Sequence, residues 1–257
     1  MTQLNKDFCF CTLALGSKYR LMIKDLAADL KKYSLGTFLI VGTDEPNDFS
    51  SIENIIAFKL VQQGIFSCYN DKRFVLEKGL LQFNRAIFLD ADTRINNKLP
   101  EIIQCSPGIN GCHKNILEHI QKYRPKNINY ILKVAAKFNI NLDTVNWVGE
   151  SLFIVTQDNG KEQEFLATWG KIASYLELKG MHSGEGNIMG LAAAKVGWTV
   201  EKSDSWKTIK QSIEHLDASR QKSNKSFGDK LKRRLGYHYR LNKSKLLALK
   251  DFDFYYR

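Results

Sequence analysis

The chain has 257 residues, enough for one large α/β domain or two small ones, and its 44% hydrophobic and 25% charged residues exclude a disordered, collagen-like or coiled-coil protein. The net charge is +11, but the last forty-two residues, Leu216 to Arg257, hold twelve Lys or Arg and four Asp and so carry +8 of it. Because the first 215 residues are close to neutral, a nucleic-acid-binding core is not favoured, and the basic C-terminal segment needs its own explanation.

The first third of the chain alternates short apolar runs with helical patterns. Strands that alternate with helices predict a mostly parallel sheet with helices on both faces, which is an α/β fold. The expected elements are strands over 8–15, 37–41, 55–61 and 86–89 and helices over 19–33 and 72–83.

Beyond residue 92 the pattern is looser, and the composition changes once, near Leu216, where the chain becomes basic and aromatic. We therefore expect a catalytic domain over 1–215 and a basic, aromatic, helical C-terminal extension over 216–257. The expected elements after residue 92 are helices over 114–123, 130–138, 161–178 and 185–196 and a strand over 147–156.

Two carboxylates follow the apolar strand 86–89 directly, in the segment AIFLDADT that contains Asp90 and Asp92. Ligands of open parallel sheets bind beyond the carboxyl ends of the strands, so this DxD motif lies where a ligand site is expected. Carboxylate oxygens suit a hard cation such as Mg²⁺ or Mn²⁺, which proteins often hold together with substrate phosphates. The alternative is an acidic surface turn.

The segment 88–93 resembles the "LDADT" of the GT-A glycosyltransferases, in particular the glycogenin and lipopolysaccharide galactosyltransferase family. More weakly, ALGSKY at 14–19, a helix, and VGTDEP at 41–46 resemble the opening of the histo-blood-group transferase family. The resemblance implies a GT-A (Rossmann-like) fold and Mn²⁺ or Mg²⁺ on Asp90 and Asp92. It also implies metal-dependent transfer of a sugar, with retention, from a nucleotide-diphosphate sugar, UDP-sugar favoured, to a hydroxyl of a glycan or lipid-linked acceptor.

The same resemblance assigns residues to the donor. Tyr19 matches a tyrosine that packs on uracil in the blood-group family, and Arg73 and Lys78 are candidates for contact with the donor phosphates or with the acids. For these two basic residues a solvated helix face is an equal alternative. The remaining donor-binding residues that the resemblance implies are Ala14, Leu15, Gly16, Asp44, Asp90 and Ala91.

A second candidate segment, HSGEGN at 182–187, stands before an Ala-rich helix. A helix N-terminus with small residues is a natural anion site, so His182 and the amides from Gly184 onward could face a diphosphate. The resemblance implies His182 as a further metal ligand and Glu185 beside the anomeric carbon. The family form HxxGxxKPW is not met, because Gly184 comes one residue early and Lys-Pro-Trp is absent. An ordinary helix cap is the alternative.

A third segment, WVGESLF at 147–153, places Glu150 among apolar residues of an expected strand. Charged side chains are seldom buried in such runs without a partner, and Glu150 could bind sugar or acceptor hydroxyls. An edge strand with Glu150 in water is the alternative. Sequence cannot place Glu150 or Glu185 relative to the anomeric carbon, so retention against inversion is not decided by these residues.

The segment 220–257 mixes basic with apolar and aromatic residues, most densely in KLKRRL at 230–235. This pattern suits an anionic membrane surface, and it would fit a lipid-linked acceptor. It also suits a nucleic acid, or a helix packed on the domain with a solvated basic face. A nucleic-acid-binding protein is therefore one alternative function. A sugar-nucleotide nucleotidyltransferase is another, although the first strand is followed by no glycine-rich GxGxR loop.

The compartment is predicted from cysteines and apolar runs. Five cysteines with no CxxC pair indicate neither a disulfide framework nor a zinc site. The apolar run 8–15 is short and follows Lys6 and Asp7, unlike a signal peptide, and no run approaches the roughly 20 residues of a membrane span. We expect a cytoplasmic protein, with peripheral contact at the inner membrane face through the tail.

Overall fold

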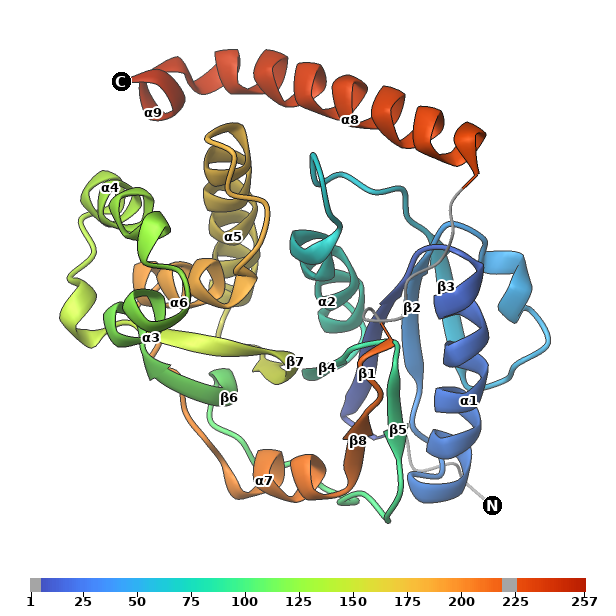
Figure 1. The fold of residues 1–257 in the computed structure, drawn as a ribbon. Coiled ribbons are helices and arrows are strands. Elements are labelled where there is room, and N and C mark those ends of the chain that lie inside the picture. Colours follow the sequence, from blue (N-terminus) through green and yellow to red (C-terminus); the bar gives the residue numbers. More distant parts are fainter. Residues whose placement is uncertain (1–5, 219–225) are drawn as a thin grey trace.

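The structure is a computed structural model that describes residues 6–218 and 226–257, and Figure 1 shows its arrangement. Its centre is a six-stranded sheet in the order β3-β2-β1-β4-β7-β6. The first four of these strands are parallel, β7 runs antiparallel to β4, and β6 runs antiparallel to β7. The expected mostly parallel sheet is confirmed. The strands are β1 (Phe8–Ala14), β2 (Leu39–Thr43), β3 (Ile55–Lys59), β4 (Arg85–Leu89), β6 (Gly108–Asn115) and β7 (Asn146–Thr156).

The two faces of the sheet bury alternate residues of each strand. In β1, Phe8 and Phe10 pack on one face and Cys9 and Cys11 on the other, as the period of two in a strand requires. The Phe face is covered by α1 (Ser17–Tyr33) and α7 (Asp204–Gln211). The Cys face is covered by α2 (Lys72–Leu80), α3 (Ile116–Tyr123), α4 (Ile128–Phe138), α5 (Lys161–Leu178) and α6 (Glu185–Lys195).

Helix α6 lies unusually close to β7, and two glycines make this approach possible. A Cβ at Gly186 would lie 2.2 Å from the Val148 carbonyl oxygen, and one at Gly190 would lie 2.0 Å from the Asn146 carbonyl oxygen. Because these two glycines are four residues apart, they share one face of the helix. The residue at the start of α6, Glu185, is thereby held against the centre of the sheet.

A second, two-stranded sheet lies beside the carboxyl end of β4. It pairs β5 (Thr93–Ile95) antiparallel with β8 (Ile213–His215), so that Thr93 lies opposite His215. Neither strand is expected from the sequence, because three residues are too few for periodicity to reveal. The preceding helix α7, also not expected, is capped by Ser203, whose hydroxyl accepts a hydrogen bond from the Trp206 backbone N–H.

The strand β6 is also a departure from the sequence expectation, in which a helix began at Lys114. Lys114 and Asn115 instead pair with Trp147 and Asn146 in the sheet. The Asn115 side chain then caps α3 by accepting hydrogen bonds from two backbone N–H groups, so the helix begins at Ile116. Two glycines and several polar residues conceal this edge strand from a hydrophobic pattern.

The C-terminal segment forms the expected helical extension, although residues 219–225 of the basic segment lie outside the described residues. Helix α8 (Phe227–Ala248) crosses the top of the molecule in Figure 1, above α5 and α2, and leads into the short α9 (Phe252–Tyr256). In α9 the Phe254 ring packs against Phe138 and Tyr175. Within the described ranges, no helix has both the length and the apolar content to cross a membrane.

Candidate active site

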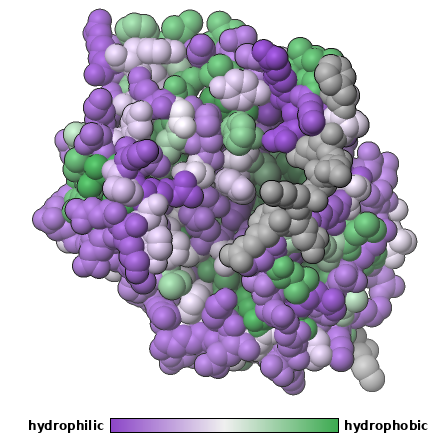
Figure 2. Space-filling view, viewed as in Figure 1, coloured by the Kyte–Doolittle hydropathy of each residue, from purple (hydrophilic) through white to green (hydrophobic). Residues whose placement is uncertain are grey.

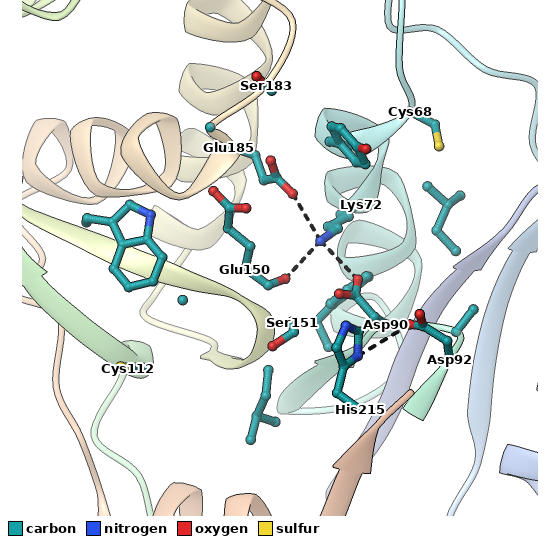
Figure 3. A pocket seen from close by; sticks show the side chains of 18 of the residues that line it. Cys68, Lys72, Asp90, Asp92, Cys112, Glu150, Ser151, Ser183, Glu185 and His215 are labelled. Carbon is teal, nitrogen blue, oxygen red and sulfur yellow. Dashed lines mark hydrogen bonds and ion pairs between the residues drawn. The ribbon is translucent and has the colours of Figure 1, made fainter. Parts of the chain in front are cut away.

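A cavity of about 710 Å³ opens at the carboxyl ends of β1 and β4 (Figure 3). Leu15 and Tyr19, which follow β1, line one side of it, and Asp90 and Asp92, which follow β4, line its floor. The opposite wall is formed by α2, β7 and the start of α6. This is the edge of a parallel sheet at which ligands are expected.

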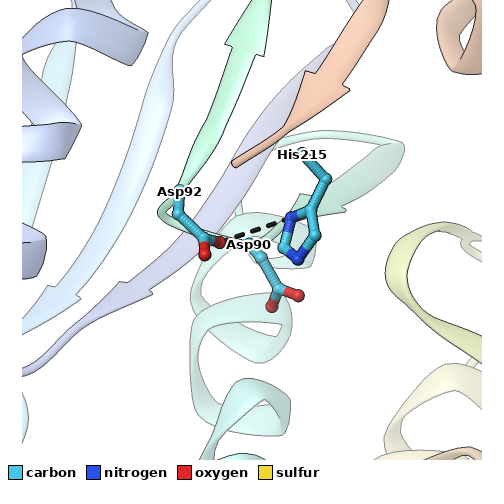
Figure 4. A group of neighbouring side chains, drawn as sticks. All are labelled: Asp90, Asp92 and His215. Carbon is cyan, nitrogen blue, oxygen red and sulfur yellow. Dashed lines mark ion pairs between the residues drawn. The ribbon is translucent and has the colours of Figure 1, made fainter. Parts of the chain in front are cut away.

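Asp90, Asp92 and His215 form one group, in which one ligand atom from each residue lies within 4.8 Å of the others (Figure 4). The β5–β8 pairing brings His215 there, because it sits opposite the residue that follows Asp92. His215 Nδ1 is 3.4 Å from Asp92 Oδ1. Asp92 also accepts hydrogen bonds from two backbone N–H groups beyond β8, those of Leu216 and Ala218. The acidic turn and the end of β8 are therefore one connected unit.

The ligand atoms of this group suit a divalent cation. Two carboxylates and one imidazole are oxygen and nitrogen ligands of the kind that Mn²⁺ accepts, and the carboxylates also suit Mg²⁺. One atom from each residue leaves coordination positions for oxygen atoms of a ligand. The charge of the cavity lining also suits a cation, because four carboxylic acids line the cavity against three lysine or arginine residues, namely Lys72, Arg124 and Lys210.

Lys72 is the buried cation on the other side of the cavity. Its Nζ lies 3.1 Å from Asp90 Oδ1 and 3.2 Å from Glu185 Oε1, and it donates a 2.8 Å hydrogen bond to the Glu150 carbonyl oxygen. Burial lowers the pKa of this amine, but the nearby carboxylates of Asp90, Glu185 and Glu150 outweigh burial and raise its pKa above the usual value. Lys72 therefore remains charged and joins α2, β4, β7 and α6 at one point.

Glu150 and Glu185 come together at the start of α6. Glu185 is buried and paired with Lys72, and Glu150 Oε1 accepts a 2.9 Å hydrogen bond from the Gly186 backbone N–H. Burial first, and then the Glu185 charge, raise the pKa of Glu150 to about 7, although the Gly186 N–H and Lys72 act in the opposite direction. Near neutral pH one carboxylate is held by the lysine and the other lies close to its titration point.

Some of the residues that the resemblance assigns to the donor line the cavity, and others do not. Leu15 and Tyr19 line the cavity, as do Ala91, Gly184 and the two acids Asp90 and Asp92. Ala14 is fully buried at the end of β1. Asp44 does not line the cavity. It accepts hydrogen bonds from the Gly16 backbone N–H at 3.0 Å and from Arg20 at 2.7 Å, and so holds the turn between β1 and α1.

Three proposed residues lie away from this cluster. Arg73 packs against Gly170 of α5 and over the Phe74 ring, and Lys78 is on the exposed side of α2. The ring of His182 contacts Phe66, at 5.5 Å between centroids, rather than either aspartate. Among the described residues the histidine of the metal group is His215, whereas the resemblance implies His182 as the metal ligand.

Sequence reasoning missed Lys72 and His215. For Lys72 a signal was present, because residues 72, 75, 76 and 79 have helical spacing and the last three are small or apolar, which puts Lys72 on the buried face of α2. Arg73 and Lys78 lie on other faces of that helix. For His215 the local signal is weak, since its strand has three residues and its partner, Thr93, lies 122 residues earlier in the chain.

No family model matches the sequence, and no curated protein matches it either. Among solved structures, the fold is similar to that of the galactosyltransferase LgtC, whose structure was determined in complex with donor and acceptor sugar analogues. The match covers 91% of this chain and 95% of that chain with a TM-score of 0.56 and 8% sequence identity. The chain therefore has the expected GT-A, Rossmann-like fold, and at this identity the likeness concerns the fold alone.

Proposed function

We propose that the protein is a metal-dependent glycosyltransferase. It moves a sugar from a nucleotide-diphosphate sugar, UDP-sugar favoured, to a hydroxyl of a glycan or lipid-linked acceptor. The observation that carries the proposal is the Asp90–Asp92–His215 group in the cavity at the carboxyl edge of the sheet. The fold supports it, because a galactosyltransferase with this fold was solved with donor and acceptor sugar analogues.

Asp90, Asp92 and His215 would hold Mn²⁺ or Mg²⁺, which supplies Lewis-acid stabilisation of the charge on the departing diphosphate. Leu15 and Tyr19 give the nucleoside an apolar and aromatic surface beside β1. Lys72 fixes the direction of the Asp90 carboxylate and holds the Glu185 carboxylate opposite it by an ion pair. The chain's own residues thus orient the donor between the two aspartates and the start of α6.

The proposed reaction is retaining, as the resemblance of the segment 88–93 to retaining families implies. Glu185 is paired with Lys72, and Glu150, with a pKa of about 7, is the residue that would take the acceptor proton in an inverting enzyme. In the retaining course the anomeric carbon–phosphate oxygen bond breaks and the acceptor oxygen bonds to the same face of the sugar. The acceptor proton passes to the released diphosphate. Glu150 and Glu185 contact sugar hydroxyls.

Thermal melting with UDP, GDP and CDP, each with Mn²⁺ and with a chelator, tests the metal requirement and the choice of nucleobase together. A ligand that binds the folded state raises the midpoint of thermal unfolding. We expect a rise with UDP and Mn²⁺ that Asp92→Asn removes, since the amide loses the charge but can still accept from Ala218 N–H. The matched control is Glu214→Gln, an exposed neighbour of His215. Equal rises in wild type and Asp92→Asn would exclude the metal role.

A transfer assay tests the reaction itself. UDP release from UDP-hexoses with Mn²⁺ identifies the donor, and proton NMR of the first product gives its anomeric configuration. We expect retained configuration. Release of an inverted product would reassign Glu150 or Glu185 as the base, and a melting response without release from any sugar nucleotide would leave a binding protein rather than a transferase.

A further inference from the structure

Helix α8 has an inner face that fastens it to the body of the protein. Arg240 Nε donates hydrogen bonds to the carbonyl oxygens of Gly64 and Ile65, the Tyr237 ring meets the Phe66 ring edge-on at 6.5 Å, and Ala248 is buried. The residues at 237, 240, 244 and 248 recur at helical spacing, which defines one face. Its position is therefore fixed, and the opposite face is turned away from the protein.

The outer face carries a row of large apolar side chains, which we call the outer stripe. In α8 it consists of Leu231, Leu235, Tyr239 and Leu246, which are 49%, 62%, 69% and 67% exposed. Spacings of four, four and seven residues keep them on one side of a helix about 33 Å long. Figure 2 shows apolar side chains among hydrophilic ones along the upper edge of the molecule. Beyond α8, Leu249, Phe252 and Tyr256 are also exposed.

Basic side chains flank the outer stripe on both sides. Lys232 follows Leu231 by one residue and Lys245 precedes Leu246 by one residue, which places them about 100° to either side of it. Nearby acids are already engaged, since Asp251 pairs with Lys171 and Asp253 with Arg257. Within residues 6–218 and 226–257 no ion pair includes any of six exposed basic residues of this segment: Lys230, Lys232, Arg233, Arg234, Lys245 and Lys250.

We propose that the outer stripe and its basic flanks are a docking surface for a lipid bilayer that contains anionic headgroups. A helix in this position buries its apolar row at the headgroup–acyl boundary while the lysines and arginines meet lipid phosphates. A nucleic acid would satisfy the basic groups but leave the leucines in water. A second copy would bring a +11 chain against another through the most basic segment of each.

Only a short stretch of chain separates the contact that holds α8 from the wall of the cavity. Arg240 holds the backbone at Gly64 and Ile65, and four residues later Cys68 and Tyr69 line the cavity wall. The wall of the cavity at Cys68 and Tyr69 is therefore close in the chain to the point at which α8 is fastened. The docking surface itself does not rest on the proposed reaction, and its test needs no sugar.

The test is sedimentation of the full chain with large vesicles of phosphatidylcholine alone or with about 30% phosphatidylglycerol, a bilayer of strongly negative surface potential. We expect binding to the anionic vesicles that weakens with salt. The double variant Leu235→Ser/Leu246→Ser should bind them at least tenfold more weakly, because two apolar side chains no longer enter the bilayer. Lys232→Gln/Lys245→Gln should bind roughly tenfold more weakly as well, and with a shallower salt dependence.

The matched control is Leu21→Ser/Leu35→Ser, which removes two leucines that are 64% and 74% exposed on other elements and should bind as the wild type does. Three results would overturn the proposal. The first is equal binding by the leucine double variant, and the second is no preference for anionic vesicles. The third is tight binding to a DNA oligonucleotide, or a mass that doubles with concentration and is lost in the leucine variant, without vesicle binding.

Discussion

The two sides of the cavity handle their charges in different ways. On one side Asp90, Asp92 and His215 place two carboxylates and an imidazole together, and Asp90 is shared with the other side through its ion pair with Lys72. On the other, Lys72 stands among Asp90, Glu185 and the Glu150 carbonyl and makes an ion pair or a hydrogen bond with each of them. We call these the metal side and the lysine side.

This difference separates what holds the fold from what binds a ligand. The lysine side makes its ion pairs within the chain, since Lys72 faces the carboxylates of Asp90 and Glu185 in a buried cluster where an unpaired charge is costly. The metal side has the ligand atoms for a cation, which under the proposed function comes from solution. The comparison therefore predicts that changes on the lysine side lower stability in the absence of any ligand, whereas changes on the metal side act mainly on metal and donor binding.

The largest effect is expected from Lys72→Met. Methionine keeps most of the packing against Phe88 but leaves buried carboxylates without their cation, so the free energy of unfolding should fall by about 4 kcal/mol, and transfer should be lost. Urea denaturation measures this. The control Lys78→Met is on the exposed side of the same helix and should change stability by less than about 0.5 kcal/mol. Unchanged stability in Lys72→Met would show that the two sides do not differ as described.

A smaller effect is expected from Gly190→Ala, which reaches the lysine side without altering a charge. Its Cβ would meet the Asn146 carbonyl oxygen, so α6 must move away from β7 at a cost of roughly 3 kcal/mol. The Mn²⁺-dependent rise in melting midpoint with UDP should survive, because Asp90 and Asp92 make their ion pairs and hydrogen bonds with Lys72, with β7 and with the end of β8 rather than with α6. The matched control is Gly228→Ala, where the nearest atom to a new Cβ is 3.8 Å away. If Gly190→Ala loses the Mn²⁺-dependent rise in melting midpoint, the metal side depends on the packing of the lysine side.

The elements that could be predicted are those whose own residues indicate them. β1, β2 and β4 are almost wholly buried, so their sequences are apolar runs that a reader can recognise. β6 is a sheet edge with Asn, His and Lys, and its pairing depends on β7, which begins more than thirty residues later. Its strand character comes from a distant partner rather than from its own composition.

The candidate site divides in the same way. Asp90 and Asp92 share one turn after one strand, so their pairing is visible in the sequence. His215 joins them only through the antiparallel pairing of two three-residue strands, and Lys72 meets Glu185 across 113 residues. Residue type and helix phase could have selected Lys72 over Arg73 and Lys78, but nothing local could have chosen His215 over His182.

The smallest effect is expected from Glu150→Gln, and it is a change in pH dependence. The pKa of Glu150 is about 7 in the folded protein and near 4.5 when unfolded, so the folded state holds this proton more tightly. The stability of the wild type therefore falls as pH rises from about 4.5 to about 7, where the carboxylate ionises within the buried cluster beside Glu185.

Glutamine cannot ionise, and its carbonyl oxygen can still accept from the Gly186 N–H. The variant should match the wild type at pH 4.5 and be more stable than the wild type at pH 8, in urea denaturation at both pH values. If the variant is less stable than the wild type at pH 8, the ionised Glu150 is a net favourable partner of Lys72. The lysine side would then hold three carboxylate charges rather than the two, of Asp90 and Glu185, that pair with Lys72 in the structure.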